Sequence, residues 1–337
     1  MKERVVGAAV LAVLAPVAAL AVPVSRELRP HPRTTAAEPS YISRVEPALL
    51  GLRVKADREA LSSVRLGAER FATAVTFDGR GYAVTVSYAL LDAVQVEAKT
   101  RDGRTVRARV AGLDLESGLG VVKLEGPGPW PAARLGQSRD VVEGTLTGTV
   151  GLDEDNDLVY VTGAVQRIRR FAGFWEYMLD RAFIVAPSTE AWGGSAVVDA
   201  AGSVVGIASL RVGAPPHVNV VIPIDRLTAV QDELIAAGRV MSRPPRPWLG
   251  LYTRDGDGAP VVDGFSPAGP AARAGFRPGD QIVGVNGVVV RSQEEFYEQL
   301  WRNRAGDVIQ VAVRRSDGVK VIAVPSVDRY RTLRQPR

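Results

Sequence analysis

Short apolar segments recur about every ten residues along the middle of the chain, and they constrain its fold more than any other feature. They are rich in β-branched and aromatic residues, and turn signals such as Asp78-Gly79 and Asp102-Gly103 separate them. The predicted strands are Phe71–Phe77, Tyr82–Val86, Ala93–Lys99, Thr105–Leu113, Leu119–Leu124, Leu158–Gln166, Ala196–Asp199, Ser203–Ser209 and Val218–Ile222. This spacing is typical of antiparallel β-barrels and β-sandwiches, and the pattern alone does not distinguish the two.

The first 40 residues differ from the rest. A basic start (MKER) precedes Val5–Val24, twenty residues without a charge, and Ala19-Leu20-Ala21 offers a signal-peptidase site. The apolar segment is also long enough to span a bilayer. Residues 1–24 are therefore predicted to be a cleaved signal or a membrane anchor at residues 5–24, and both place the chain in the periplasm or cell envelope. Residues 25–40, rich in proline and polar residues, are predicted to be a flexible linker.

Composition excludes several kinds of site. The chain has no cysteine and two histidines, His31 and His217, so an imidazole-dependent mechanism is restricted to these two residues. The sequence shows no cluster of metal ligands, and we expect neither a metal nor a cofactor. The net charge of +5 is spread along the chain without a basic stripe that carries interleaved aromatics. This distribution argues against nucleic acid as a partner.

A glycine turn, Trp192-Gly193-Gly194-Ser195, precedes two of the predicted strands. Together with Val204–Ile207 (VVGI), it resembles the nucleophile segment of the HtrA family of trypsin-like serine proteases, which reads roughly GNSGGPLVNxxGxVVGI. Three earlier segments match the family in the same order: GYAVTVSYALLDA, DGRTVRARVAGLDLESGLGVVKL and ARLGQS. The resemblance implies a mostly β fold, in which residues 41–240 form two antiparallel barrels with a cleft between them.

The same resemblance places the family's catalytic serine, histidine and aspartate at Gly193, Tyr88 and Gly118. A serine protease needs a hydroxyl nucleophile, an imidazole base and a carboxylate that orients the imidazole. Glycine supplies no side chain, and a phenol with a pKa of about 10 is a poor base at neutral pH. The sequence therefore predicts a protease fold without protease chemistry.

Several readings of this region stay open. Ser195 is a fallback nucleophile that could pair with His217, or else a plain turn residue. Backbone N–H groups from Ala191 to Gly193 could still form an oxyanion hole. The aromatic insertion Arg169–Asp180 is predicted to be a short helix packed on the barrel, with an exposed partner-binding loop as the alternative. The carboxylates of Asp114 and Glu116 are expected to be solvated.

The remaining segments follow in order. Asp225–Arg239 has a helical apolar period that ends at Gly238, and residues 241–247 form a proline-rich linker. Residues 248–327 resemble a small α+β PDZ domain of the HtrA type, on the strength of GPAARAGFRPGD and the later VNG. A capping box at Ser292 begins its helix. Residues 328–337 are a basic tail that is expected to be frayed.

The PDZ resemblance also implies a peptide-binding site. The loop residues Trp248, Leu249, Gly250, Leu251 and Tyr252 would hold a terminal carboxylate on backbone N–H groups, with the guest peptide added as a strand. Phe296 and Leu300 would line the pocket for the last apolar side chain, or would serve only as core.

The sequence therefore predicts an exported HtrA-like pseudoprotease that binds protein C-termini or extended peptides as an adaptor, chaperone-like holder or regulator. Active HtrA relatives or further copies in a trimer are additional expected partners. An active endopeptidase with a displaced nucleophile and a structural envelope subunit are the alternatives.

Overall fold

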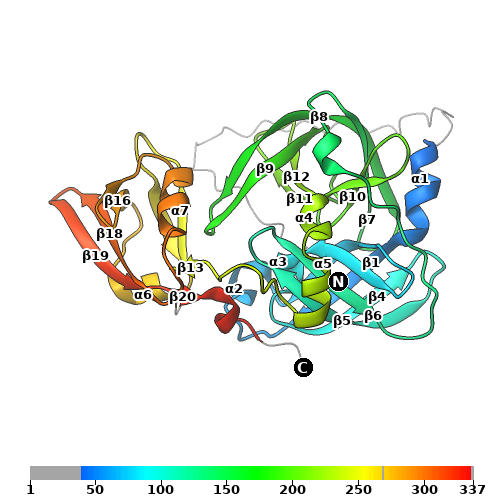
Figure 1. Ribbon diagram of the computed structural model, residues 1–337, viewed down its shortest axis with the longest axis horizontal. Helices are drawn as coiled ribbons and strands as arrows, with labels where there is room; N and C mark the ends of the chain where they lie inside the picture. The colour runs from blue at the N-terminus through cyan, green and yellow to red at the C-terminus, as the bar shows by residue number, and fades with distance from the viewer. Residues whose placement is uncertain (1–38, 268, 335–337) are drawn as a thin grey trace, which may run out of the picture.

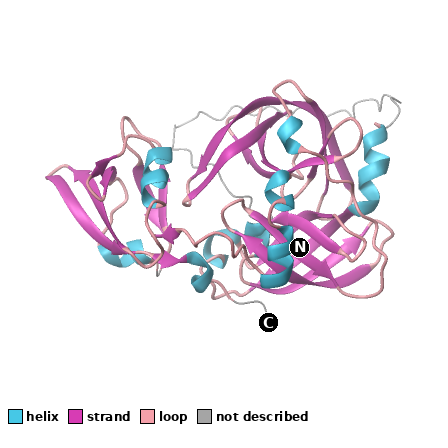
Figure 2. Ribbon diagram, in the orientation of Figure 1, coloured by secondary structure: helices cyan, strands magenta, loops and turns pink. Residues whose placement is uncertain are grey.

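Strands dominate the computed structural model, which describes residues 39–267 and 269–334 (Figure 2). Two closed barrels lie together, and a smaller domain is attached beside them (Figure 1). The predicted mostly β fold is confirmed. The predicted signal or anchor and the first linker, apart from its last residues, lie outside the described residues. Within the described ranges, none of the helices is both long and apolar enough to cross a membrane.

The first barrel is closed in the strand order β1-β2-β3-β6-β5-β4. Its strands are β1 (Leu49–Ala56), β2 (Glu69–Thr76), β3 (Tyr82–Val86), β4 (Ala93–Thr100), β5 (Thr105–Asp114) and β6 (Leu119–Leu124). The helices α1 (Ser40–Val45), η1 (Glu46–Ala48), α2 (Ser63–Leu66) and α3 (Ser87–Leu90) accompany them. The predicted strands in this part match closely, whereas β1 was not predicted.

The second barrel is closed in the order β10-β11-β12-β9-β8-β7. Its strands are β7 (Leu146–Leu152), β8 (Leu158–Gly173), β9 (Tyr177–Ala186), β10 (Ala196–Val198), β11 (Val204–Val212) and β12 (Val218–Pro223), with the short helix η2 (Ser138–Asp140) before them. The predicted helix in Arg169–Asp180 is wrong, because these residues form the end of a long β8–β9 hairpin. The helix predicted after this barrel divides into α4 (Asp225–Thr228) and α5 (Gln231–Ala237).

Successive side chains of a strand point to opposite faces. Apolar residues on both faces of a strand can therefore contribute to two different apolar clusters. On β3, Ala83 belongs to the interior cluster of the first barrel, whereas Val84 and Val86 belong to a cluster that also contains Val150 and Leu152 of the second barrel. The two barrels therefore share one apolar cluster where they contact each other.

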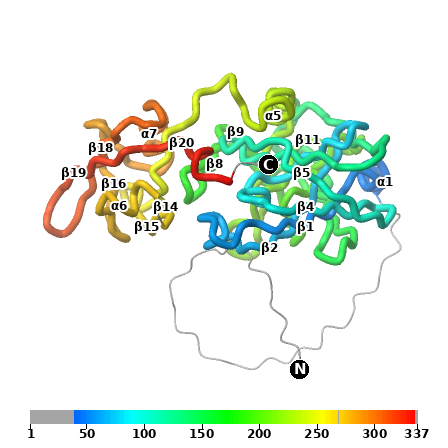
Figure 3. Tube along the Cα trace, turned by 90° about the horizontal axis from the view of Figure 1, so that it is seen from below, coloured from blue at the N-terminus to red at the C-terminus, as the bar shows by residue number. Residues whose placement is uncertain are grey.

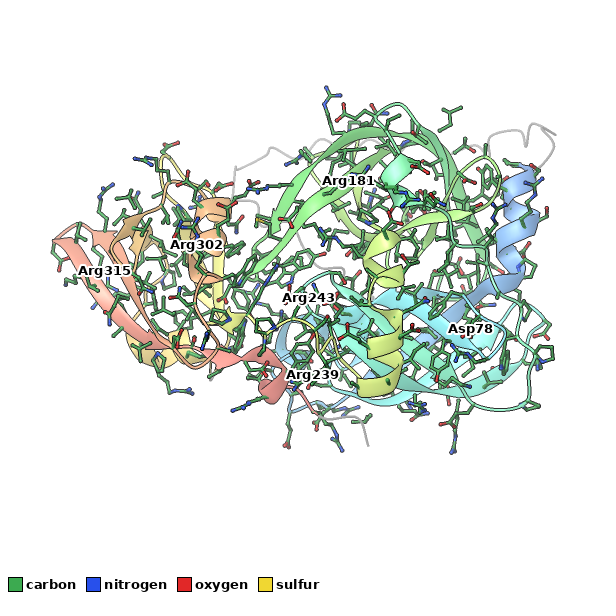
Figure 4. The ribbon with its side chains drawn as sticks, in the orientation of Figure 1. Asp78, Arg181, Arg239, Arg243, Arg302 and Arg315 are labelled. Carbon is green, nitrogen blue, oxygen red and sulfur yellow. The ribbon has the colours of Figure 1, made fainter. Side chains whose placement is uncertain are left out.

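Carboxylates of the first barrel hold the proline-rich linker. Asp114 and Glu116 pair with Arg243 at 3.0 and 3.2 Å, and Glu116 also pairs with Arg246 at 3.0 Å. Arg243 lies at the junction of the barrels with the smaller domain (Figure 4). The expectation that these carboxylates are solvated is wrong, since the Asp114 side chain is only 2% exposed.

The smaller domain has one main sheet and two helices. The sheet order is β14-β15-β16-β18-β19, with β17 paired to β16, and β13 pairs separately with β20. The bounds are β13 (Pro247–Trp248), β14 (Leu251–Arg254), β15 (Val261–Phe265), α6 (Pro270–Ala274), β16 (Gln281–Val285), β17 (Val288–Val289), α7 (Gln293–Leu300), β18 (Val308–Arg315), β19 (Gly318–Pro325) and β20 (Val327–Asp328). The Ser292 hydroxyl caps α7 by accepting from the Glu295 N–H at 3.1 Å. Strand β14 is thus an edge strand of the main sheet.

The C-terminal tail returns to the first barrel (Figure 3). After β20 it forms the short helix η3 (Arg329–Thr332), and Leu333 packs against the interior cluster of that barrel. The Tyr330 hydroxyl donates to the Leu113 carbonyl and accepts from the Leu115 N–H, both at 3.1 Å. The expectation of a frayed tail is therefore wrong as far as Arg334, because tertiary contacts supply what the local sequence lacks.

Removing that hydroxyl is expected to loosen the tail. Tyr330→Phe leaves the two backbone groups of β5 and its following turn without their bridge, at a cost of about 1–2 kcal/mol. Hydrogen exchange of the Leu333 amide should therefore speed up about tenfold. Tyr160→Phe makes the same chemical change on an exposed tyrosine of β8 and should leave the exchange unaltered. Equal exchange in both variants would contradict the bridging role.

Candidate functional site

Two of the predicted triad positions meet in the cleft between the barrels. Tyr88 lies in α3, directly after β3, and Gly193 lies in the turn before β10. A Cβ atom on Gly193 would stand 3.2 Å from the Tyr88 hydroxyl. That hydroxyl donates to the Ser209 carbonyl at 2.7 Å, and burial raises its pKa further above the ordinary value. Tyr88 therefore cannot act as a base toward a group at position 193 near neutral pH.

The third position adjoins them and is filled from β9. Gly118 has a φ of +81°, and its carbonyl accepts from the Ser87 N–H at 2.7 Å. A Cβ atom here would lie 2.8 Å from the Tyr177 hydroxyl, which donates to the Ser117 carbonyl at 2.7 Å. Tyr177 thus occupies the space that an orienting carboxylate would need.

The fallback nucleophile is contradicted by the structure. Ser195 is 0% exposed, and its hydroxyl donates to the Ala191 carbonyl inside the second barrel wall. His217 lies in the β11–β12 connection, where its Nδ1 is 2.7 Å from the Gly213 carbonyl. A buried hydroxyl cannot reach a substrate, so the Ser195 side chain is a structural element of the turn.

The remainder of the cleft stays open. It has a volume of about 570 Å³ and is lined by residues that include Tyr88, Trp192 and Gly193, so the indole does not fill it. The Ala191 N–H, one of the expected oxyanion-hole donors, donates instead to the Thr189 hydroxyl at 3.2 Å. The cleft therefore retains room for a chain segment, while one of its expected donors is engaged by the protein itself.

The predicted carboxylate-binding loop does bind a carboxylate, but one from within the chain. The N–H groups of Leu249 and Leu251 donate to the two Glu176 side-chain oxygens at 2.9 and 2.6 Å. Gly250 between them has a φ of +79°, a backbone conformation that allows both N–H groups to face one anion. Glu176, at the tip of the β8–β9 hairpin, is only 7% exposed.

Other predicted residues of the small domain surround this loop. Trp248 is buried beside it, and the Tyr252 ring contacts the Phe174 ring at 5.8 Å between centroids. Phe296 and Leu300 are both 0% exposed within the domain core. Their burial fits the interpretation that they are core residues. Met178 of the β8–β9 hairpin belongs to the same apolar cluster.

Burial raises the pKa of Glu176 to about 7. The N–H groups of Leu249 and Leu251 and the nearby Arg329 guanidinium act in the opposite direction, since they favour the charged form. The carboxyl group therefore changes its charge near neutral pH while it is held in the loop.

The sequence analysis did not predict that the β8–β9 hairpin would occupy the groove between β14 and α7. The contacts between the hairpin, the small domain and the tail involve Glu176, Met178, Gln293, Tyr297 and Arg329. The aromatic residues of the insertion Arg169–Asp180 were the available signal of a binding segment. Of the two interpretations of this insertion, the partner-binding loop is nearer to the observed structure than the packed helix. The partner of that loop is the chain's own small domain.

Comparisons with known proteins agree with this architecture. A trypsin-like peptidase domain family matches residues 72–207, and a PDZ domain family matches residues 247–325. Serine endoprotease DegS of Escherichia coli strain K12 is 28% identical over 265 residues, which cover 72% of each chain. DegS of Salmonella typhimurium is 27% identical over 266 residues, also 72% of each chain. The solved structure of the HtrA-type protease AlgW with decapeptide shares the fold, with a TM-score of 0.53 and 24% identity over 88% of this chain and 98% of that chain.

Proposed function

Because the chain belongs to the HtrA family, with a trypsin-like domain followed by a PDZ domain, we propose that it is a pseudoprotease that binds protein C-termini or extended peptides. The observation that carries the proposal is the content of the three predicted triad positions: a half-buried phenol at Tyr88 and no side chain at Gly118 or Gly193. A nucleophile and a base are both required for acyl transfer, so the remaining function of the fold is binding.

The PDZ domain supplies the binding site in this proposal. Its loop already holds a carboxylate on the N–H groups of Leu249 and Leu251, which supports recognition of a terminal carboxylate by the same donors. The protein would act as an adaptor, a chaperone-like holder or a regulator of active HtrA relatives, and a homotrimer is the expected assembly. A structural envelope subunit is the second candidate, and retention of residues 5–24 as an anchor together with one tight partner would favour it.

The proposed location is the periplasm or cell envelope. It rests on the basic start of the chain and the uncharged segment Val5–Val24, the two features that direct a protein to export. Whether that segment is cleaved decides between a free and an anchored form.

The proposal predicts that the purified protein does not cleave an unfolded substrate. Residues 26–337 and their Ser195→Ala variant should both leave β-casein intact over a long incubation, beside an active HtrA protease as a positive control. Neither protein should react with a fluorophosphonate probe, which labels only activated serines. Cleavage or labelling that disappears in Ser195→Ala would overturn the pseudoprotease proposal.

A further inference from the structure

We propose that the tip of the β8–β9 hairpin is a resident ligand of the PDZ groove, and that a protein C-terminus with an apolar last residue binds by displacing it. The proposal rests on the peptide-binding function proposed above and adds how access to the groove is controlled. Figure 1 shows the hairpin leaving the second barrel and ending beside the PDZ domain.

The hairpin tip docks along the open edge of β14. The Thr253 N–H of that strand donates to the Phe174 carbonyl at 2.8 Å. Two residues further along the tip and two residues back along β14, the Glu176 carboxylate accepts from the Leu251 N–H, so the tip runs antiparallel to the strand. Edge strands offer unpaired backbone groups to a further strand, and PDZ domains recognise peptides in this way.

Helix α7 holds the other side of the tip. The Tyr297 hydroxyl donates to the Gly173 carbonyl at 2.7 Å and accepts from the Glu176 N–H at 3.1 Å. The Gln293 amide donates to the Thr253 carbonyl at 2.6 Å and lies 3.3 Å from the Gly173 carbonyl. The tip is therefore bonded on both walls of the groove, to β14 and to α7.

Glu176 and Met178 together reproduce the end of a peptide chain. The Glu176 carboxylate accepts hydrogen bonds from the N–H groups of the loop. The backbone of Glu176 has a φ of +56°, which turns the main chain away from β14 immediately afterwards. Met178 then belongs to the same hydrophobic cluster as Phe296 and Leu300. Glu176 and Met178 thus supply separately the carboxylate and the apolar side chain that one apolar C-terminal residue would combine.

The resident tip and an external C-terminus exclude each other. The N–H groups of Leu249 and Leu251 can serve one carboxylate at a time, and the open edge of β14 can pair with one strand. The apparent affinity for an external peptide is therefore reduced by the fraction of molecules whose groove is occupied by the hairpin. Weakening the resident ligand should tighten external binding.

The test compares two carboxylates of the same hairpin in the full-length protein. Glu176→Ala removes the side chain that occupies the groove loop, and Asp180→Ala is the matched control, since the Asp180 side chain is 61% exposed outside the groove and lies 3.6 Å from Arg226. The probe is a fluorescein-labelled decapeptide that ends in Phe-Trp-Met with a free carboxylate, and the same peptide with a terminal amide serves as the ligand control.

Glu176→Ala is expected to bind the free-acid peptide at least about tenfold more tightly than the wild type and Asp180→Ala, and no protein should bind the amide. Equal affinity of the wild type and Glu176→Ala would overturn the resident-ligand proposal and leave peptide binding intact. Failure of every protein to bind the free-acid peptide would overturn the proposed peptide-binding function itself.

A second measurement does not depend on the folding of Glu176→Ala. The chain contains no cysteine, so Ala172→Cys places a single thiol on the hairpin where it packs against the PDZ core. Saturating free-acid peptide should speed the labelling of this thiol severalfold, whereas the exposed thiol of Asp180→Cys should react at an unchanged rate. An unchanged labelling rate of Ala172→Cys with bound peptide would overturn displacement.

Discussion

An aspartate at the predicted third triad position, introduced by Gly118→Asp, is expected to lower the free energy of unfolding by about 2–4 kcal/mol. Gly118 has a φ of +81°, which costs energy for a residue with a side chain, and a Cβ atom would lie 2.8 Å from the Tyr177 hydroxyl. Tyr177 is held by its bond to the Ser117 carbonyl and cannot move aside without breaking it. Denaturant unfolding of the purified variant measures the loss.

Gly193→Ser is the matched control for that prediction. Among the described residues, apart from the two chain neighbours, only the Tyr88 hydroxyl comes within contact distance of a new Cβ atom at position 193, at 3.2 Å, so the stability should change by less than about 1 kcal/mol. The combined variant Tyr88→His, Gly118→Asp, Gly193→Ser should remain inactive, because Tyr177 occupies the place of the carboxylate. A stable and active combined variant would contradict this account of the site.

Peptide affinity is expected to rise with pH, by at least about tenfold between pH 5 and pH 8. The docked Glu176 carboxyl has a pKa of about 7, raised from 4.5 by burial. A carboxyl whose pKa is raised by docking favours the docked state fully below pH 4.5 and loses this contribution as the pH rises through 7. The hairpin is therefore held most firmly in acid and most weakly above neutrality, and an external C-terminus, ionised throughout this range, gains access.

Fluorescence anisotropy of the labelled peptide across this pH range measures the effect. The groups that face Glu176 are the N–H groups of Leu249 and Leu251, the Tyr297 hydroxyl and the Arg329 guanidinium, and these groups keep their charge over the range. Glu176→Gln should therefore bind with an affinity that is nearly independent of pH. A pH dependence of the same size in Glu176→Gln would assign the effect to another group.

Much of the fold could be predicted because many of its strands and turns have recognisable local sequence patterns. Alternating apolar residues and turn glycines identified β3 and β6 at their observed bounds, and the loop at Gly250 was predicted to bind a carboxylate. Strands β1, β7 and β9 were not predicted, and the segment Arg169–Asp180, which forms the end of β8, the turn and the start of β9, was predicted to be a helix. The aromatic residues Phe174, Trp175 and Tyr177 fit a helix as well as a hairpin, so periodicity could not decide between them.

The contents of the triad positions are a property of the sequence alone. A glycine at position 193 cannot supply a hydroxyl nucleophile, and a tyrosine at position 88 cannot supply an imidazole, whatever residues surround them. Once the resemblance assigned those positions, the prediction that they hold neither a nucleophile nor an imidazole base followed from residue identity.

Only the tertiary structure decided what fills the PDZ groove. Glu176 and the Leu249 N–H are 73 residues apart in the chain, and Tyr330 is 217 residues from the Leu113 carbonyl. These long-range hydrogen bonds cannot be predicted from local sequence patterns. Hydrogen bonds and desolvation depend on which groups the completed fold brings into contact. The same glutamate in an exposed hairpin would be an ordinary solvated carboxylate, and burial against the loop turns it into a ligand.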